Sequence, residues 1–332
     1  MALHAVDDLS DAYRATRAFL LPLEWGRWLR LALLSLFVAG SSGGGAPTGG
    51  FQGPLGTSPD LTPGGGTEFG GTIDQIGAML SNNLWFILGV IGVFFLLGLV
   101  LQWVSATFEF TFLESLRTDE VHVREFTSEY TGLGTRLFAF RILFGLATLL
   151  VFGGLALLAI GPLLMGISPA APLLLLVFLI PVSFVLGIVA AVGYVFTTAF
   201  VAPIMLLEDR GVLSAWKRFW GVFKSAWTDF LVFVLVGLFL MIAIGIVVGI
   251  AMAVIGVGIA LPVFVALLAG GPLLAALLGI PAAVLAILAW AMVQVPVQTY
   301  LRHWALLVLG DIEPELDLIP DRRGAVRGET TS

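Results

Sequence analysis

Residues 142–207 read ILFGLATLLVFGGLALLAIGPLLMGISPAAPLLLLVFLIPVSFVLGIVAAVGYVFTTAFVAPIMLL and contain no Asp, Glu, Lys or Arg. A membrane-spanning helix needs roughly 20 apolar residues, so this run has room for two spans and a turn. The cluster GISPAAP at residues 166–172 combines Gly, Ser and two prolines, which favour a break between helices. The stretch therefore predicts a helical hairpin with spans near residues 137–164 and 173–206.

A second uncharged run, residues 230–301, has room for two more spans. Two clusters favour turns, Gly256-Val257-Gly258 and Gly270-Gly271-Pro272, and they place those spans near residues 229–255 and 273–300. Residues 256–272 between them are apolar but too short to cross a bilayer on their own. They are expected to form an interfacial piece, a re-entrant piece or part of a span, and a re-entrant piece would need its backbone covered by protein.

Two further stretches complete the membrane domain, residues 25–310. Uncharged residues 75–108 predict a span near residues 83–104, and a shorter Leu-rich stretch predicts a weaker first span near residues 25–40. The composition agrees, because 59% of the residues are hydrophobic and 11% are charged, with mean hydropathy +1.04. A soluble domain carries about 25% charged residues. The fold class expected is an all-α, polytopic integral membrane protein with six transmembrane helices.

The distribution of basic residues predicts the orientation. With six spans, all 16 Lys and Arg residues lie on one side of the membrane, in segments 1–30, 105–141, 207–229 and 301–332. The other side carries only acids: Asp60, Glu68 and Asp74. The positive-inside rule then places both termini in the cytoplasm of a multi-pass protein of the plasma membrane. A cleaved signal peptide is the alternative for the first span, but the region before it is long and contains acids, unlike a signal n-region.

The segments outside the spans differ in character. Residues 41–72 are rich in Gly and Pro, and we expect an external flexible loop, because ordering such a chain costs entropy and buries little. Residues 1–24 read as a cytoplasmic amphipathic helix, and the tail, residues 311–332, is expected to be disordered. In residues 208–229 one helical stripe flanked by cations predicts a second amphipathic helix at the headgroup layer: Leu213, Trp216, Phe219, Trp220, Phe223 and Trp227.

A few polar positions are candidates for function. Glu109 and Arg141 lie near the inner ends of predicted spans, where ionisable groups are functional by default; the favoured alternative for Glu109 is a hydrated helix end, and the Arg141 side chain can snorkel to the headgroups. Arg141 would be stabilised by pairing with Glu109 or Glu208. Gln294 and Gln298 share one helix face and suit interhelical hydrogen bonds. The remaining candidates form a gate or docking point, or else mark a helix end at the interface: Glu208, Asp209 and Arg218.

The run PIMLLEDRGVLSAWKRFW, residues 203–220, resembles a pattern in prokaryotic multi-pass membrane proteins. It is similar to the membrane domain of glycerophosphodiester phosphodiesterases and its uncharacterised relatives. The Gly-rich loop after a short first span resembles a haloarchaeal family with a domain of unknown function. The resemblance implies an architecture and no chemistry, because those phosphodiesterases act through a separate soluble barrel domain.

Most catalytic classes lack support in the sequence. The chain has no Cys, three isolated His residues, no metalloprotease or serine-hydrolase motif, and a net charge of −6 without a basic stripe. We therefore expect no enzyme activity, no cofactor, no metal and no nucleic-acid partner; the lipid bilayer is the expected partner. The predicted function is a non-enzymatic role in membrane organisation or as an accessory to other membrane proteins. The alternative is a transporter or permease for a small or lipid-like solute, which would need a midplane cavity lined by residues such as Gln294, Gln298, Ser183, Tyr194 or Thr197.

Overall fold

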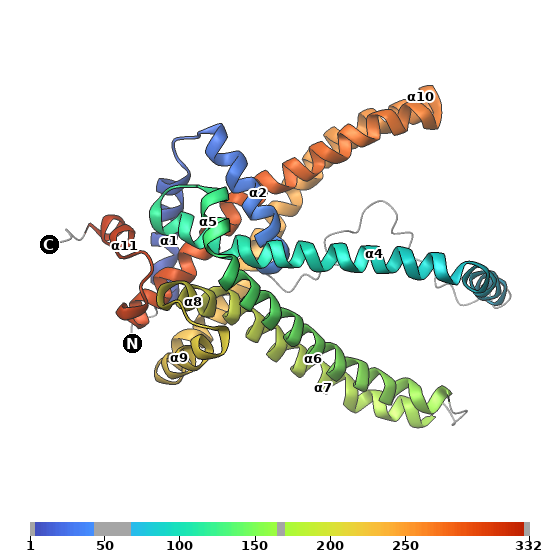
Figure 1. The fold of residues 1–332 in the computed structure, drawn as a ribbon, viewed down its shortest axis with the longest axis horizontal. Coiled ribbons are helices and arrows are strands. Elements are labelled where there is room, and N and C mark those ends of the chain that lie inside the picture. The colour runs from blue at the N-terminus through green and yellow to red at the C-terminus, as the bar shows by residue number, and fades with distance from the viewer. Residues whose placement is uncertain (1–3, 43–67, 165–169, 329–332) are drawn as a thin grey trace.

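The computed structural model describes residues 4–42, 68–164 and 170–328, and over these ranges the chain is built from helices and short connections (Figure 1). The α-helices are α1 (His4–Leu20), α2 (Trp25–Ser42), α4 (Glu68–Thr118), α5 (Val123–Glu129), α6 (Thr131–Leu164), α7 (Ala170–Phe196), α8 (Ala202–Glu208), α9 (Val212–Ser225), α10 (Trp227–Ile312) and α11 (Pro320–Arg327). A π-helical turn, η1 (Thr197–Val201), joins α7 to α8, and a 3-10 turn, η2 (Pro314–Leu316), follows α10.

The helices form a packed base from which three arms extend (Figure 1). One arm is α4, the second is the α6–α7 pair and the third is α10. We use "base" for α1, α2, α5, α8, α9, α11 and the ends of the arm helices that pack with them. Both chain ends lie at the base. Within the described residues, four helical stretches are long and apolar enough to cross a membrane: Trp85–Thr118, Thr131–Pro162, Leu175–Glu208 and Trp227–Ile312.

The last of these stretches doubles back on itself. Gly271 has φ 76° and ψ −173°, a backbone conformation that is essentially restricted to glycine. The rings of Phe233 and Trp304 stack with centroids 4.2 Å apart, whereas a straight helix would separate them by roughly 100 Å. α10 is therefore a helical hairpin with two long limbs. Of the three alternatives for residues 256–272, the structure agrees with part of a span, because the first limb stays helical up to Gly270 and turns at Gly271 instead of ending at residue 255. Interior glycines cost a helix only about 1 kcal/mol each.

α2 is not one of the four long apolar helices, because it is short and carries Arg27 and Arg30. It lies between α4 and α10, with Leu31 and Leu34 fully buried. The Ser35 hydroxyl donates to the Ala291 carbonyl of α10 at 3.2 Å. The first predicted span is thus a helix, as expected, but one that is packed on two neighbours.

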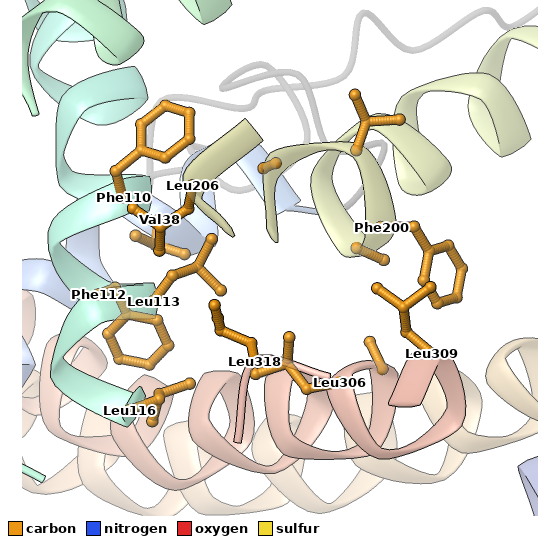
Figure 2. Close-up of a cluster of buried hydrophobic side chains, with 14 of the residues drawn as sticks. Val38, Phe110, Phe112, Leu113, Leu116, Phe200, Leu206, Leu306, Leu309 and Leu318 are labelled. Atoms are coloured by element: carbon orange, nitrogen blue, oxygen red, sulfur yellow. The ribbon is translucent and has the colours of Figure 1, made fainter. Parts of the chain in front are cut away.

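The hydrophobic core lies in the base. Figure 2 shows buried side chains converging on one another from several helices: Val38 of α2, Phe110, Phe112, Leu113 and Leu116 of α4, Phe200 of η1, Leu206 of α8, Leu306 and Leu309 of α10, and Leu318. α4 and α6 approach each other closely at Gly134 and Thr107, as shown by the position that a Cβ atom on Gly134 would take, only 2.7 Å from the Thr107 Cα. Such packing fixes the directions in which the arms leave the base.

The C-terminal tail contradicts the expectation of disorder. α11 packs on α1, and Arg327 pairs with Asp8 (2.6 Å), Asp11 (2.9 Å) and Asp311 (2.8 Å). Three carboxylates from two helices therefore bind one guanidinium, which holds the tail on the base. Residues 329–332 of the predicted tail, and residues 43–67 of the predicted Gly-rich loop, lie outside the described residues.

Candidate functional site

A buried ion network joins the three arms where they leave the base. Glu109 comes from α4, Arg141 from α6 and Arg302 from α10. The Arg141 guanidinium donates to Glu109 Oε2 at 3.2 Å, and Arg302 pairs with Glu109 Oε1. One carboxylate thus contacts a guanidinium from each of the other two arms.

The network is excluded from solvent. The side chains of Glu109, Arg141 and Arg302 are 0%, 2% and 5% exposed, respectively. Removing charges from water costs several kcal/mol per ion, so the pairs form only because the geometry returns much of that energy. Two guanidiniums and one carboxylate leave one positive charge in excess at the junction.

The irregular turn η1 completes the network. A π-helical turn frees backbone carbonyls from the regular helical pattern and is frequent at functional sites. Here the Thr198 carbonyl accepts a hydrogen bond from Arg302 at 2.5 Å. On the other side, the Arg141 guanidinium lies 5.6 Å from the centre of the Tyr194 ring, within cation–π range. The α6–α7 arm therefore contributes a cation, a ring and a carbonyl to the same junction.

Sequence reasoning identified Glu109 and Arg141 as candidates but missed Arg302. Of the two partners considered for Arg141, the structure gives it Glu109. Gln294, Gln298 and Arg302 lie four residues apart along one face of α10, and this spacing was the signal that could have revealed the arginine. Both glutamines are buried, and the Gln298 amide donates to Gln294 at 3.5 Å, within the helix.

The other candidates lie in a separate, more exposed ion cluster. Arg218 of α9 contacts Glu208 at 3.8 Å, and also pairs with Glu313 (3.2 Å) and Glu315 (2.9 Å) near the end of α10. Asp209 has φ 46° and ends α8 in the left-handed conformation. This cluster ties α8 and α9 to the C-terminal segment.

The aromatic stripe predicted on residues 208–229 divides into two faces. Phe219 is fully buried in α9 and stacks on Phe200 at 5.5 Å, and Trp216 and Phe223 are half-buried. Trp220 and Trp227 are 49% and 57% exposed. The prediction of one membrane-facing stripe is wrong, because the dense Phe cluster around η1 takes the inner face for the core.

Two polar cavities open at the base. One, of about 500 Å³, is lined by Glu114, Arg117, Thr118, Leu207 and residues 317–322. The other, of about 340 Å³, is lined by residues of the α1–α2 junction and by residues 119–122. The residues expected around a transport cavity line neither of them: Thr197, Gln294 and Gln298 are buried, and Tyr194 and Ser183 are partly buried.

Two carboxyl groups where the C-terminal tail meets the base, those of Asp8 and Asp317, have raised pKa values. Burial, and secondarily the negative charge of Asp311, raise the pKa of Asp8 to about 7, although Arg327 acts in the opposite direction. Burial also raises the pKa of Asp317, which pairs with Arg323 at 2.9 Å. No cluster of three or more His, Asp or Glu side chains with metal-site geometry occurs within the described part of the chain.

Comparison with known proteins gives a family and no characterised relative. Residues 3–319 match a family model described as a family of unknown function, DUF7544. No curated protein and no solved structure matches the chain. The match covers nearly the whole sequence, including all three arms and the ion network that joins them. The chain belongs to the DUF7544 family.

Proposed function

We propose that this chain is a non-enzymatic, multi-pass protein of the plasma membrane that organises the membrane or assists other membrane proteins. In this proposal the arms and α2 lie in the bilayer, and the rest of the base, with both termini, lies at the cytoplasmic surface. The chain crosses six times, through α2, α4, α6, α7 and the two limbs of α10.

The sixth crossing, by α2, follows from connectivity. The C-terminal part of α4 is buried in the base, and the N-terminal end of this 51-residue helix lies far from the base (Figure 1). The chain must therefore return across the bilayer between α1 and Glu68. The Gly-rich segment, residues 43–67, is unsuited to this, because lipid-exposed irregular backbone leaves its polar groups unsatisfied. An 18-residue α2 is about 27 Å long, close to the thickness of the hydrocarbon core.

The sidedness rests on charge. All 16 basic residues belong to the base or to the inner ends of the arms, and the hairpin turns carry none. Basic residues are enriched in cytoplasmic segments. The tail that Arg327 binds to α1 then lies in the cytoplasm as well.

The exposed apolar surface of the arms carries the functional proposal. In α4, α6 and α7, none of the residues in the most hydropathic stretch is buried. Phe94, Leu150 and Phe184, one from each of these helices, are each 68–69% exposed. Separate arms with apolar surfaces on all sides suit contacts with lipid and with other transmembrane helices.

The test of this function uses the absence of cysteine from the chain. A transporter needs a water path through the arms, so Ser183→Cys or Gln294→Cys would react with a charged, membrane-impermeant thiol reagent. An organising or accessory protein leaves both unlabelled in intact membranes, while Ser214→Cys, exposed on the base, reacts after permeabilisation. Labelling of either arm position from one or both sides would replace the proposal with the transporter alternative.

A second measurement addresses the partners directly. Photoreactive benzoylphenylalanine at Phe94 or Phe184 should give discrete protein adducts in cells, whereas the same group at the buried Phe219 should give none. Adducts with lipid alone at both arm positions would contradict an accessory role. The proposal also includes two resemblances. The sequence of residues 203–220 supports the similarity to the phosphodiesterase membrane domain, and the Gly-rich loop supports a haloarchaeal source.

A further inference from the structure

The outward face of α9 combines aromatic, aliphatic and lysine side chains. We call it the α9 outer face and define it by Leu213, Lys217, Trp220, Lys224 and the following Trp227. Leu213, Lys217, Trp220 and Lys224 repeat at helical spacing, Trp227 follows the break at Ala226 (φ −127°, ψ 37°), and all five residues are exposed. The opposite face, with Val212, Ala215, Phe219 and Val222, is buried against the base. The orientation of the outer face is therefore fixed by the core.

Its charge is of one sign. Lys217 and Lys224 are the only lysines in the chain, and α9 contains no acidic residue. Arg218, which points elsewhere, is held by Glu208, Glu313 and Glu315. Neither lysine forms an ion pair with a described residue, and the Lys224 ammonium lies 5.7 Å from the centre of the Trp220 ring. Both ammonium groups are thus available to an external anion.

We propose that the α9 outer face binds the headgroups of anionic lipids in the cytoplasmic leaflet. The proposal deepens the proposed function, since it rests on the base lying at that surface. Indole rings settle at the headgroup level, where one end meets acyl chains and the other meets water. Lysine stems extend along apolar surface while their ammonium groups reach phosphate. A face that alternates indole rings with lysine side chains fits a negatively charged phospholipid better than a neutral one, because its ammonium groups attract the negative headgroup.

The position of α9 along the chain supports this ligand. Trp227 begins α10, whose first exposed apolar residues, such as Leu231 and Leu235, follow within two turns. The outer face therefore lies next to the point where an arm enters the bilayer. A soluble anion would leave the indole rings exposed to water, whereas a bound lipid would cover them.

The experiment titrates the detergent-solubilised full chain with short-chain phosphatidylglycerol, phosphatidylcholine or inorganic phosphate, and counts bound molecules by native mass spectrometry. We expect phosphatidylglycerol to bind more tightly than phosphatidylcholine. Lys217→Gln with Lys224→Gln should weaken it on the order of tenfold, because each basic residue near an anionic surface contributes about a factor of several. Trp220→Ala should weaken it too. Arg124→Gln with Arg136→Gln, two exposed arginines elsewhere on the base, should change nothing.

Four results would overturn the proposal. If phosphatidylglycerol and phosphatidylcholine bind equally tightly, the face does not select anionic lipid. If the lysine and arginine double variants lose equal affinity for phosphatidylglycerol, the binding is not specific to the α9 outer face. Phosphate binding that competes with lipid and is insensitive to Trp220→Ala would indicate a site for a free anion. A change of oligomeric state in the lysine variant, with lipid binding intact, would assign the face to a protein contact. The lipid titration measures binding directly, so it decides the lipid-binding proposal independently of the thiol experiment. If the thiol experiment shows water-accessible arms, the proposed function is refuted, but lipid binding by the α9 outer face is not.

Discussion

Glu109→Gln is the substitution that most sharply tests whether the buried network holds the arms together. The change keeps the size of the side chain and removes the one carboxylate that pairs with Arg141 and Arg302. Two guanidiniums that are 2% and 5% exposed would then face each other's charge without a counter-ion. Removing one partner of a buried ion pair typically costs about 3–5 kcal/mol.

The expected effect on thermal stability can be scaled from that figure. A loss of 1 kcal/mol lowers Tm by about 2–4 °C in domains of 150–250 residues, so we expect a decrease on the order of 10 °C. Fluorescence-detected size-exclusion chromatography of heated, detergent-solubilised protein provides the measurement. Glu120→Gln is the control at an exposed pair just after the same helix: Glu120 lies 3.3 Å from His122, their side chains are 68% and 50% exposed, and such pairs contribute about 0–1 kcal/mol.

A triple variant separates charge from packing. Glu109→Leu, Arg141→Met and Arg302→Met together remove every charge from the network, and replacing a whole buried ion network by apolar side chains is often neutral or stabilising. The triple variant should therefore melt well above Glu109→Gln. If Glu109→Gln melts at the same temperature as the Glu120→Gln control, or if the triple variant is the least stable of all, these charges do not hold the junction together.

Three further predictions follow from single features. Gly134→Ala should lower Tm because its Cβ would overlap Thr107, whereas Gly132→Ala, which meets no atom within 4 Å, should not; equal Tm values would refute the close approach of α4 and α6. The pKa of Asp8 is raised from 3.8 to about 7, so between these pH values Asp8 holds a proton in the folded state that the unfolded chain has lost. Folding stability should therefore fall as the pH rises from about 4 to 7 and level off above pH 7. Asp8→Asn should flatten that part of the Tm–pH curve, and an unchanged curve would count against the tail junction. Replacing residues 43–67, between α2 and α4, with a shorter Gly-Ser linker should leave insertion and Tm nearly unchanged, because loop closure changes by only about 0.6 kcal/mol per doubling of length. Unfolding of that variant would show that the segment packs on the arms.

The helices and their apolar character could be predicted from hydropathy and turn residues alone. The pair Gly270–Gly271 was recognised as a breaker, yet the helix was ended too early, at residue 255. Hydropathy cannot distinguish glycines that remain inside a helix from the one glycine whose φ and ψ reverse the chain. The short α2 illustrates a different limit: its contacts with α4 and α10 are long-range, and no local pattern encodes them.

The site could be predicted in part for the same reason. Glu109 and Arg141 stand out because they are charges near apolar runs, but Arg302, the second partner of Glu109, lies 193 positions beyond Glu109 along the chain. Phe219 and Trp220 are adjacent in one aromatic stripe, and only the Phe cluster around η1 decides which of them faces the core. The tail was misjudged because its low hydrophobicity is typical of disorder, whereas ion pairs to α1 and α10 hold it in place.

Labelling of single cysteines in intact cells tests the central claim, six crossings with the base in the cytoplasm. The informative positions are Asp60, before α4, and Leu273, which is 85% exposed at the turn of α10; Ser214 and Arg124, on the base, serve as the opposite pair. The account predicts that a membrane-impermeant thiol reagent labels Asp60→Cys and Leu273→Cys from outside. Ser214→Cys and Arg124→Cys should react only after permeabilisation. Protection of Asp60→Cys would remove α2 as a crossing, and external labelling of Ser214→Cys would contradict the orientation of the whole molecule.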